Sequence, residues 1–541
     1  MRSRLAVVLL VAFVLAPFLI SRRTLIVLFF PKTASAQYGG HTTYTAKSRS
    51  YPATVQQGTI LVMFRESASL IKIDEILKEN QLEIRSGIPG LSLFVVMTRQ
   101  PPSSCEDETE RLRAIIERLK QYVEIEAAVT NVRLSPTLIP RRNAPIPPAT
   151  GCWSWTGCAN EDRNGTRPLI TMKFPQAWNF SAAMQGRHCT VGVLDIGFVP
   201  HRRDLRMRSA SRCGTNADFH GTHIAGVIGA GFGNGVGIDG AAGGFADIVT
   251  CAPLIEQPRA RAELRDLSVS EAQTLGVVER GQSFESCLRS LETLLHEPLR
   301  VINASIGYNW SELSIVPEEN PGAQQIVREQ GLMVRKLLAQ FPKTVLVTSA
   351  GNDCRSSNCT QQAMWTSPFN WAALGDPTPL EPRSTNVIVV EALDRGGREL
   401  DTSNRGGTIA AIGQNIVSTG DNNSYGSCGE GTSCSAPFVT ATIALMLSLD
   451  PNLEVSDLKT RLLIGGRTLN AFEAVKACDP RADLHLADID NSGTVDIRDL
   501  LLFDNRLTTT DPRELSLSRL DVTGDGNVNG ADRRFIEQMI R

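Results

Sequence analysis

Two stretches of the chain show different patterns of apolar and polar positions. In the first stretch, apolar runs typical of strands alternate with apolar positions at helical spacing. The predicted strands are 58–65, 91–97 and 123–132, and the predicted helices are 70–77 and 112–119. This β-α-β-α-β order indicates a small α+β unit over residues 57–135.

The second stretch, residues 165–477, alternates apolar β-branched runs with helical patterns. Continuous apolar runs are typical of strands buried on both faces, so we expect an α/β domain with a mostly parallel sheet flanked by helices. The strand candidates are 190–194, 247–251, 301–304, 345–348 and 387–390.

The segments outside these domains carry other signals. Residues 1–36 have two arginines before an apolar run and end at Ala34-Ser35-Ala36, which predicts a signal peptide, with an uncleaved anchor as the alternative. Residues 136–164 are expected to be a linker and processing region, because their first part holds five prolines and no apolar periodicity.

Composition narrows the function classes. The 541 residues carry a net charge of -2, with 21% charged and 42% hydrophobic residues, which argues against disorder and gives no electrostatic reason to expect a nucleic-acid partner. Residues 482–541 alone hold 12 acidic and 7 basic side chains, a net charge of -5 that indicates a separate module.

Twelve cysteines fit an oxidising compartment. The pairs close enough for local disulfides are Cys152 with Cys158 and Cys354 with Cys359. Cys189 and Cys251 lie inside strand-like runs, where a buried thiol is the alternative to a disulfide.

An aspartate and a histidine are the first two candidate catalytic residues. Asp195 ends the run CTVGVLDIG, where a carboxylate can orient a histidine, although by itself it would be a turn or cap residue. His220 opens HGTHIAG, and His223 follows three residues later. Zincin helices separate their histidines by four residues with a Glu between them, so a metal pair is the weaker interpretation.

A serine and an asparagine complete the candidates. Ser433 in GTSCSAP precedes a helical run, where backbone N–H groups and the helix dipole suit an oxyanion, with a plain N-cap as the alternative. Pro437 is expected in the first turn of that helix. Asn352 in VLVTSAGN can donate its amide to the same oxyanion, or it fills a turn.

The chain order Asp, His, Ser is that of subtilisin. With VINASIG, the four motifs resemble those of the subtilisin-like serine peptidases, the subtilase or peptidase S8 family, over roughly residues 165–477. The resemblance implies that Asp195 orients His220, that His220 takes the proton of Ser433, and that Asn352 and the Ser433 N–H stabilise the oxyanion. It implies that a substrate strand binds along the backbone of Ser305, Ile306 and Gly307. It also implies that one wall of the pocket for the residue before the scissile bond is formed by Ala350 and Gly351.

Two residues depart from the usual family pattern. Ile196 stands where the family usually has Thr or Ser, so a hydroxyl that helps to hold the carboxylate is missing. Cys434 stands where an apolar residue is common. Its thiol could be oxidised or paired, for instance with Cys428, which would make activity depend on redox state.

The unit over 57–135 resembles in its pattern the prodomains of subtilases, especially the fervidolysin-like kind. This resemblance implies a propeptide that assists folding and inhibits the protease until it is cleaved in the linker.

Two segments of residues 482–541 share the spacing of a calcium loop, with glycine at position 6. The candidate ligands are Asp488, Asp490, Ser492, Thr494, Asp496 and Asp499 in the first loop, and Asp521, Thr523, Asp525, Asn527, Asn529 and Asp532 in the second. Asp replaces Glu at position 12, and a helix is expected after each loop (500–507 and 535–540) but not before it. These features resemble dockerin domains, which implies a small all-α module, Ca²⁺ as the cofactor with no organic cofactor, and a cohesin-like partner. A calcium-stabilised cap is the alternative.

We therefore expect a secreted, or cell-surface attached, serine endopeptidase that is made as a zymogen, acts on polypeptides and is inhibited by its own prodomain. We expect no nucleic-acid partner and, after signal cleavage, no membrane contact. The alternative is a catalytically silent subtilase-like scaffold attached through its dockerin-like module. The presence of all four catalytic positions favours the enzyme.

Overall fold

The chain forms two compact units, the first built on Gln56–Asn131 and the second on Val132–Glu256 and Ala262–Arg541. The computed structural model describes residues 43–45, 54–98, 105–136, 168–184, 186–214, 216–234, 236–254, 282–311, 315–354, 361–377, 382–427, 429–509 and 520–540. The expected signal peptide and residues 137–164 of the expected linker lie outside these residues.

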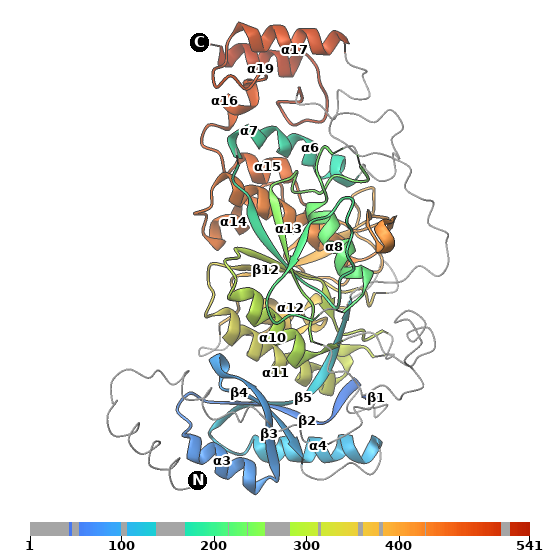
Figure 1. Cartoon of the computed structure of the whole chain (residues 1–541), viewed down its shortest axis with the longest axis vertical. Coiled ribbons are helices and arrows are strands. Elements are labelled where there is room, and N and C mark those ends of the chain that lie inside the picture. Colours follow the sequence, from blue (N-terminus) through green and yellow to red (C-terminus); the bar gives the residue numbers. More distant parts are fainter. Residues whose placement is uncertain are drawn as a thin grey trace, which may run out of the picture. The chain divides into compact units, whose positions relative to one another are not determined.

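In the first unit, an antiparallel sheet carries helices α3 and α4 on one face (Figure 1). Strand β4 pairs with both β2 and β3, and apolar side chains such as Phe64, Ile76 and Ile116 form the core. The elements at this end of the chain are β1 (Thr43–Thr45), β2 (Thr54–Phe64), α3 (Leu70–Glu79), β3 (Leu82–Ile88), η1 (Pro89–Leu91), β4 (Leu93–Thr98), α4 (Cys105–Leu119) and β5 (Ile125–Pro136).

Strand β3 corrects the predicted β-α-β-α-β order, because it adds a strand between α3 and β4. Its pairing with β4 shifts register between Ile84 and Ser86, and Ile84 is 43% exposed. Such a bulge breaks the alternation of apolar and polar positions, which is the signal used to predict a strand.

A seven-stranded sheet forms the centre of the second unit, in the order β14-β13-β12-β10-β6-β8-β7, with parallel pairing throughout. The five predicted strands are confirmed as β6 (Cys189–Leu194), β8 (Ala246–Cys251), β10 (Val301–Ala304), β12 (Val345–Ser349) and β13 (Val387–Leu393). The two edge strands are β7 (Met207–Ser209) and β14 (Ile409–Ile412).

The other elements of this unit are mostly helices. They are α6 (Phe174–Ala177), η2 (Trp178–Phe180), α7 (Ser181–Met184), α8 (Phe219–Gly229), β9 (Gln282–Ser283), α10 (Phe284–Leu295), β11 (Ile306–Gly307), η4 (Pro317–Glu319), α11 (Pro321–Leu338), η5 (Ala363–Trp365), α12 (Pro368–Leu374), β15 (Val417–Thr419), η6 (Asp421–Asn423), β16 (Tyr425–Ser427), α13 (Thr432–Leu449), α14 (Val455–Leu462), α15 (Ala471–Lys476), α16 (Ala482–Ala487), α17 (Ile497–Thr509) and α19 (Gly530–Met539).

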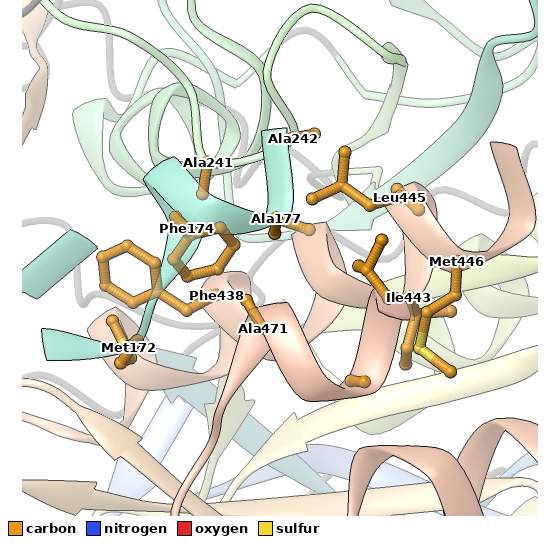
Figure 2. Close-up of a cluster of buried hydrophobic side chains, with 14 of the residues drawn as sticks. Met172, Phe174, Ala177, Ala241, Ala242, Phe438, Ile443, Leu445, Met446 and Ala471 are labelled. Atoms are coloured by element: carbon orange, nitrogen blue, oxygen red, sulfur yellow. The ribbon is translucent and has the colours of Figure 1, made fainter. Parts of the chain in front are cut away.

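Helix α13 is the core helix of the second unit. It is long and apolar enough to cross a membrane, but all of its residues are buried within the unit. Figure 2 shows Phe438, Ile443, Leu445 and Met446 of α13 among the buried side chains, with Phe174 of α6 beside Phe438. Because α13 is covered all round, its sequence is apolar on every face.

The C-terminal helices pack on the same core. Leu486, Phe503 and Ile536 belong to one buried apolar cluster with Phe472 of α15. Two expectations are corrected: α16 precedes the first loop, where no helix was expected, and α17 and α19 begin at Ile497 and Gly530, inside the loops. Helix α19 begins early because Asn529 caps it, and its capping box uses Asp532, the last residue of the second loop.

The end of β5 belongs to the second unit. Ser135 and Pro136 pair with Gly307 and Ile306 of β11, and Arg133 and Leu134 pair with Ser283 and Gln282 of β9, both in antiparallel register. The predicted strand therefore extends beyond residue 132 and forms a second set of pairings.

Candidate functional site

The predicted site residues gather at the carboxyl ends of neighbouring strands. Strand β10 lies between β6 and β12, and all three run parallel. Asp195 directly follows β6, Ser305 follows β10, and Ala350 follows β12. Parallel strands bring their carboxyl ends to one edge of a sheet, so residues 155 positions apart along the chain come to the same edge.

Asp195 and His220 form a buried pair. The Nδ1 atom of His220 lies 2.7 Å from Asp195 Oδ1 and 2.9 Å from Oδ2. The Ile196 N–H also donates to Asp195 Oδ1, at 2.8 Å. The backbone therefore supplies a donor from the residue that lacks the usual family hydroxyl.

The start of helix α8 holds His220 in place. Asp218 is the N-cap, and its Oδ1 accepts a hydrogen bond from the His220 N–H at 2.8 Å. Gly221 lies so close to β6 that a Cβ atom there would be 2.3 Å from Gly197 O and 2.9 Å from Asp195 Cβ. A side chain at residue 221 would therefore push His220 away from Asp195.

Burial sets the charge state of this region. Complete burial raises the pKa of the Asp195 carboxyl, while the neighbouring His220 counteracts this effect. Burial also lowers the pKa of His223 to about 3, so this imidazole stays neutral at ordinary pH. The His223 carbonyl accepts a hydrogen bond from Ser418 of β15, which ties α8 to that strand.

Ser433 lies in the first turn of α13, and α13 packs against α8. Pro437 is one turn further into the helix than expected. A residue at 437 would normally donate its N–H to the Ser433 carbonyl, which proline cannot do. That carbonyl instead accepts a hydrogen bond from the Ser305 hydroxyl at 3.4 Å.

Hydrogen bonds hold Asn352 against the start of α13. Its Oδ1 atom accepts a hydrogen bond from the Thr432 N–H at 2.9 Å, and the Thr432 hydroxyl accepts one from the Gly351 N–H at 3.0 Å. These reciprocal bonds join the end of β12 to the residue before Ser433. Because Oδ1 is the acceptor here, the amide NH₂ of Asn352 points elsewhere and can serve as a donor.

Two of these anchoring residues, Asp218 and Thr432, were not predicted from the sequence. Asp218 carries a recognisable signal, since Asp is a favoured N-cap and a helical run follows it. The sequence around Thr432 carries no signal of its bonds to Gly351 and Asn352, because those residues are 80 or more positions away.

The predicted substrate residues occupy two places. Ile306 and Gly307 form β11, whose edge is paired with the end of β5. Ser305 and Ala350 are completely buried. The structure therefore presents β11 as backbone for strand pairing, whereas the Ser305 and Ala350 side chains are not exposed.

The cysteines partly follow the prediction. Cys189 is a buried free thiol, as one alternative held, whereas Cys251 forms a disulfide with Cys213, 38 residues away. Cys354 and Cys434 are both disulfide-bonded. Four cysteines named above lie outside the described residues: Cys152, Cys158 and Cys359 of the local pairs, and Cys428, the suggested partner of Cys434.

The two predicted calcium loops have the same internal hydrogen bonds. In each, the carboxylate at position 1 accepts from the glycine N–H at position 6, and the carboxylate at position 12 accepts from the N–H groups at positions 3 and 9. In the first loop, ligand atoms of Asp488, Asp490 and Asp499 lie within 4.8 Å of one another. In the second, Asp521 and Asp532 are fully buried. Carboxylates converging in this way suit a hard cation such as Ca²⁺.

Comparisons with known proteins agree with this picture. The subtilase family model matches residues 186–469, and the dockerin type I domain model matches residues 486–541. The minor extracellular protease Epr of Bacillus subtilis (strain 168) is 27% identical over 293 residues, which cover 52% of this chain but only 35% of that protein. Subtilisin DY of Bacillus licheniformis is 25% identical over 303 residues, which cover 54% of this chain and 88% of that protein.

A solved structure resembles a larger part of the chain. Fervidolysin from Fervidobacterium pennivorans, a keratinolytic enzyme related to subtilisin, superposes with a TM-score of 0.50 at 17% identity, over 82% of this chain and 65% of that one. This likeness concerns the fold. Together the matches confirm the expected subtilisin-like fold, the resemblance to subtilases and the resemblance to dockerins.

Proposed function

The chain belongs to the subtilase family, and from that premise we propose that it is an extracellular serine endopeptidase using Asp195, His220 and Ser433. The observation that carries this proposal is the fully buried pair of Asp195 and His220, with 2.7 Å between Oδ1 and Nδ1. That pair lies at the strand edge from which α8 and α13 begin.

Each residue of the triad would have its own task. Asp195 occupies the Nδ1 side of His220, so the opposite ring nitrogen, Nε2, takes the proton from the Ser433 hydroxyl. The serine oxygen then attacks the carbonyl carbon of the peptide bond. The resulting imidazolium is stabilised by the Asp195 carboxylate and returns its proton to the leaving amine.

The oxyanion of the tetrahedral intermediate would be held by two donors. These are the Asn352 amide, whose orientation follows from the bond between its Oδ1 and the Thr432 N–H, and the backbone N–H of Ser433. A substrate strand would pair with Ile306 and Gly307 and place its scissile bond at Ser433. Ser305, Ala350 and Gly351 would shape the wall beside it.

The first unit is proposed to be an inhibitory propeptide. The support is the end of β5, because Ser135 and Pro136 already pair with the β11 edge that a substrate strand would use. The precursor would therefore be inactive until the chain is cut downstream of residue 136. Replacing Ser433 by Ala is expected to leave the full-length precursor uncut, as followed by gel electrophoresis and intact mass. Unaided maturation of that variant would contradict self-cleavage.

Calcium is proposed to bind in both C-terminal loops, in line with the dockerin match. The repeated hydrogen bonds and the three converging carboxylates of the first loop support this assignment. In the second loop, Asp521 Oδ1 is buried and accepts no hydrogen bond from the described residues, and a cation would satisfy this oxygen. The ion would add no chemistry to peptide cleavage and would order the loops.

Attachment and location follow as further parts of the proposal. A dockerin-like module suggests a cohesin-like partner. The disulfide between Cys213 and Cys251, together with the bonded Cys354 and Cys434, suits an oxidising extracellular setting. The similarity to an extracellular bacterial protease points the same way.

Labelling with a fluorophosphonate tests the catalytic proposal. The matured protein is expected to take up one label per chain on Ser433, as located by peptide mass spectrometry. Ser433→Ala should abolish labelling, and Ser435→Ala, a buried serine on the same helix, should retain it. An unlabelled native protein would instead favour the silent scaffold.

A further inference from the structure

The second calcium loop is built into the surface of the catalytic domain. Leu520, just before this loop, and Val522 within it lie in the same buried cluster as Phe174 and Phe472, and so does Ile489 of the first loop. Gly524 faces the Phe472 ring so closely that a Cβ atom at residue 524 would be 2.2 Å from the ring. The first loop makes no such glycine contact, since a Cβ at Gly493 would meet nothing within 4 Å.

A buried polar contact joins this loop to helix α6. The Gln176 amide donates to Asp521 Oδ2 at 2.7 Å, across 345 positions of the chain. Gln176 is 1% exposed and Asp521 is fully buried. The other oxygens, Gln176 Oε1 and Asp521 Oδ1, accept no hydrogen bond from the described residues. A buried carboxylate with such an oxygen is costly unless a cation compensates it.

Helix α6 also contacts α13, whose first turn contains the candidate nucleophile Ser433. Phe174 packs against Phe438 of α13 with ring centroids 5.8 Å apart (Figure 2). The Met172 carbonyl accepts a hydrogen bond from Ala471 N at the start of α15. Residues 172–176 are therefore held between the second calcium loop and α13.

We propose that calcium in the second loop stabilises the folded catalytic domain, with Gln176 as the positioning residue between the loop and that domain. The proposal rests on the calcium function proposed above. The ion would satisfy the buried Asp521, keep the loop against Phe472 and Gln176, and so oppose unfolding of the catalytic domain. The first loop would bind calcium without this effect.

Tryptophan fluorescence can follow the catalytic domain apart from the first unit and the C-terminal module, because residues 57–135 and 482–541 contain no tryptophan, and four of the six tryptophans lie in residues 165–477. The full-length chain with Ser433→Ala, which prevents self-digestion, is unfolded by heat with calcium chloride or with a chelator. At a free calcium concentration a hundredfold above Kd, the fluorescence midpoint is expected to rise by about 4 °C.

Two matched pairs of variants locate the effect. Asp525→Ala and Asp490→Ala each remove one exposed carboxylate, at position 5 of the second loop and at position 3 of the first. Only Asp525→Ala should abolish most of the shift. Gln176→Leu should at least halve the shift. Gln324→Leu, which removes the hydrogen bonds from the Gln324 side-chain amide to the Pro317 and Glu318 carbonyls of η4, should leave it unchanged.

Titration calorimetry on the same proteins separates the two levels of the proposal. If the parent binds calcium but Asp525→Ala and Asp490→Ala show the same fluorescence shift, the stabilising role of the second loop is overturned and the calcium sites stand. An equal shift in Gln176→Leu and the parent would overturn the role of Gln176. If the parent takes up no calcium, both the proposed calcium binding and the proposed stabilisation of the catalytic domain are overturned.

Discussion

Replacing Asp195 by Asn is expected to lower kcat about 10⁴-fold while the protein still folds. Both carboxylate oxygens of Asp195 lie within 2.9 Å of His220 Nδ1, in a fully buried position. In the proposed mechanism this carboxylate would hold the tautomer that leaves Nε2 able to accept the serine proton, and it would stabilise the imidazolium that forms. An amide of the same shape can donate to Nδ1 and so favours the wrong tautomer, and it carries no charge.

Asp218→Asn is the matched control for this prediction. Asp218 is also bonded to His220, but its Oδ1 accepts from the backbone N–H at 2.8 Å. Since Asn caps helices about as well as Asp, kcat is expected to change by less than about tenfold. Turnover of a chromogenic peptide and thermal unfolding are measured for both variants. Similar losses in the two would point to a general effect of negative charge near His220 and contradict the specific role of Asp195.

The location of the catalytic candidates could be predicted because they follow buried strands. Asp195 and Asn352 come at or just after apolar runs whose β-branched residues indicate parallel strands. Parallel pairing then forces their carboxyl ends onto one edge, so the motifs converge without any knowledge of side-chain positions. Local sequence was sufficient for this part of the site.

Contacts between distant residues could not be predicted in the same way. The disulfide of Cys213 with Cys251 depends on how β8 lies against the segment between β7 and α8, and cysteine spacing does not encode this pairing. Gln176 gives no sign in the sequence that it will meet Asp521. Strand β3 was missed for a local reason, since its bulge disrupts the alternation that marks a strand.

Replacing Asn352 by Leu is expected to lower kcat by roughly 10²–10³ with little change in KM. The proposed amide donor would act on the oxyanion, which exists only after the serine has attacked. The Michaelis complex would therefore lose little. Initial rates over a range of peptide concentrations separate kcat from KM, and a rise in KM with unchanged kcat would contradict the oxyanion role.

Asn352→Asp distinguishes catalysis from anchoring, because Asn352 also accepts the Thr432 N–H at 2.9 Å. Aspartate keeps this acceptor in nearly the same shape but loses the NH₂ donor and adds a negative charge where the oxyanion forms. If the amide stabilises the oxyanion, kcat of the Asp variant falls at least as far as that of the Leu variant. If Asn352 only anchors the start of α13, the Asp variant keeps most of its activity and Leu alone is impaired. The order of the two kcat values therefore decides between the roles.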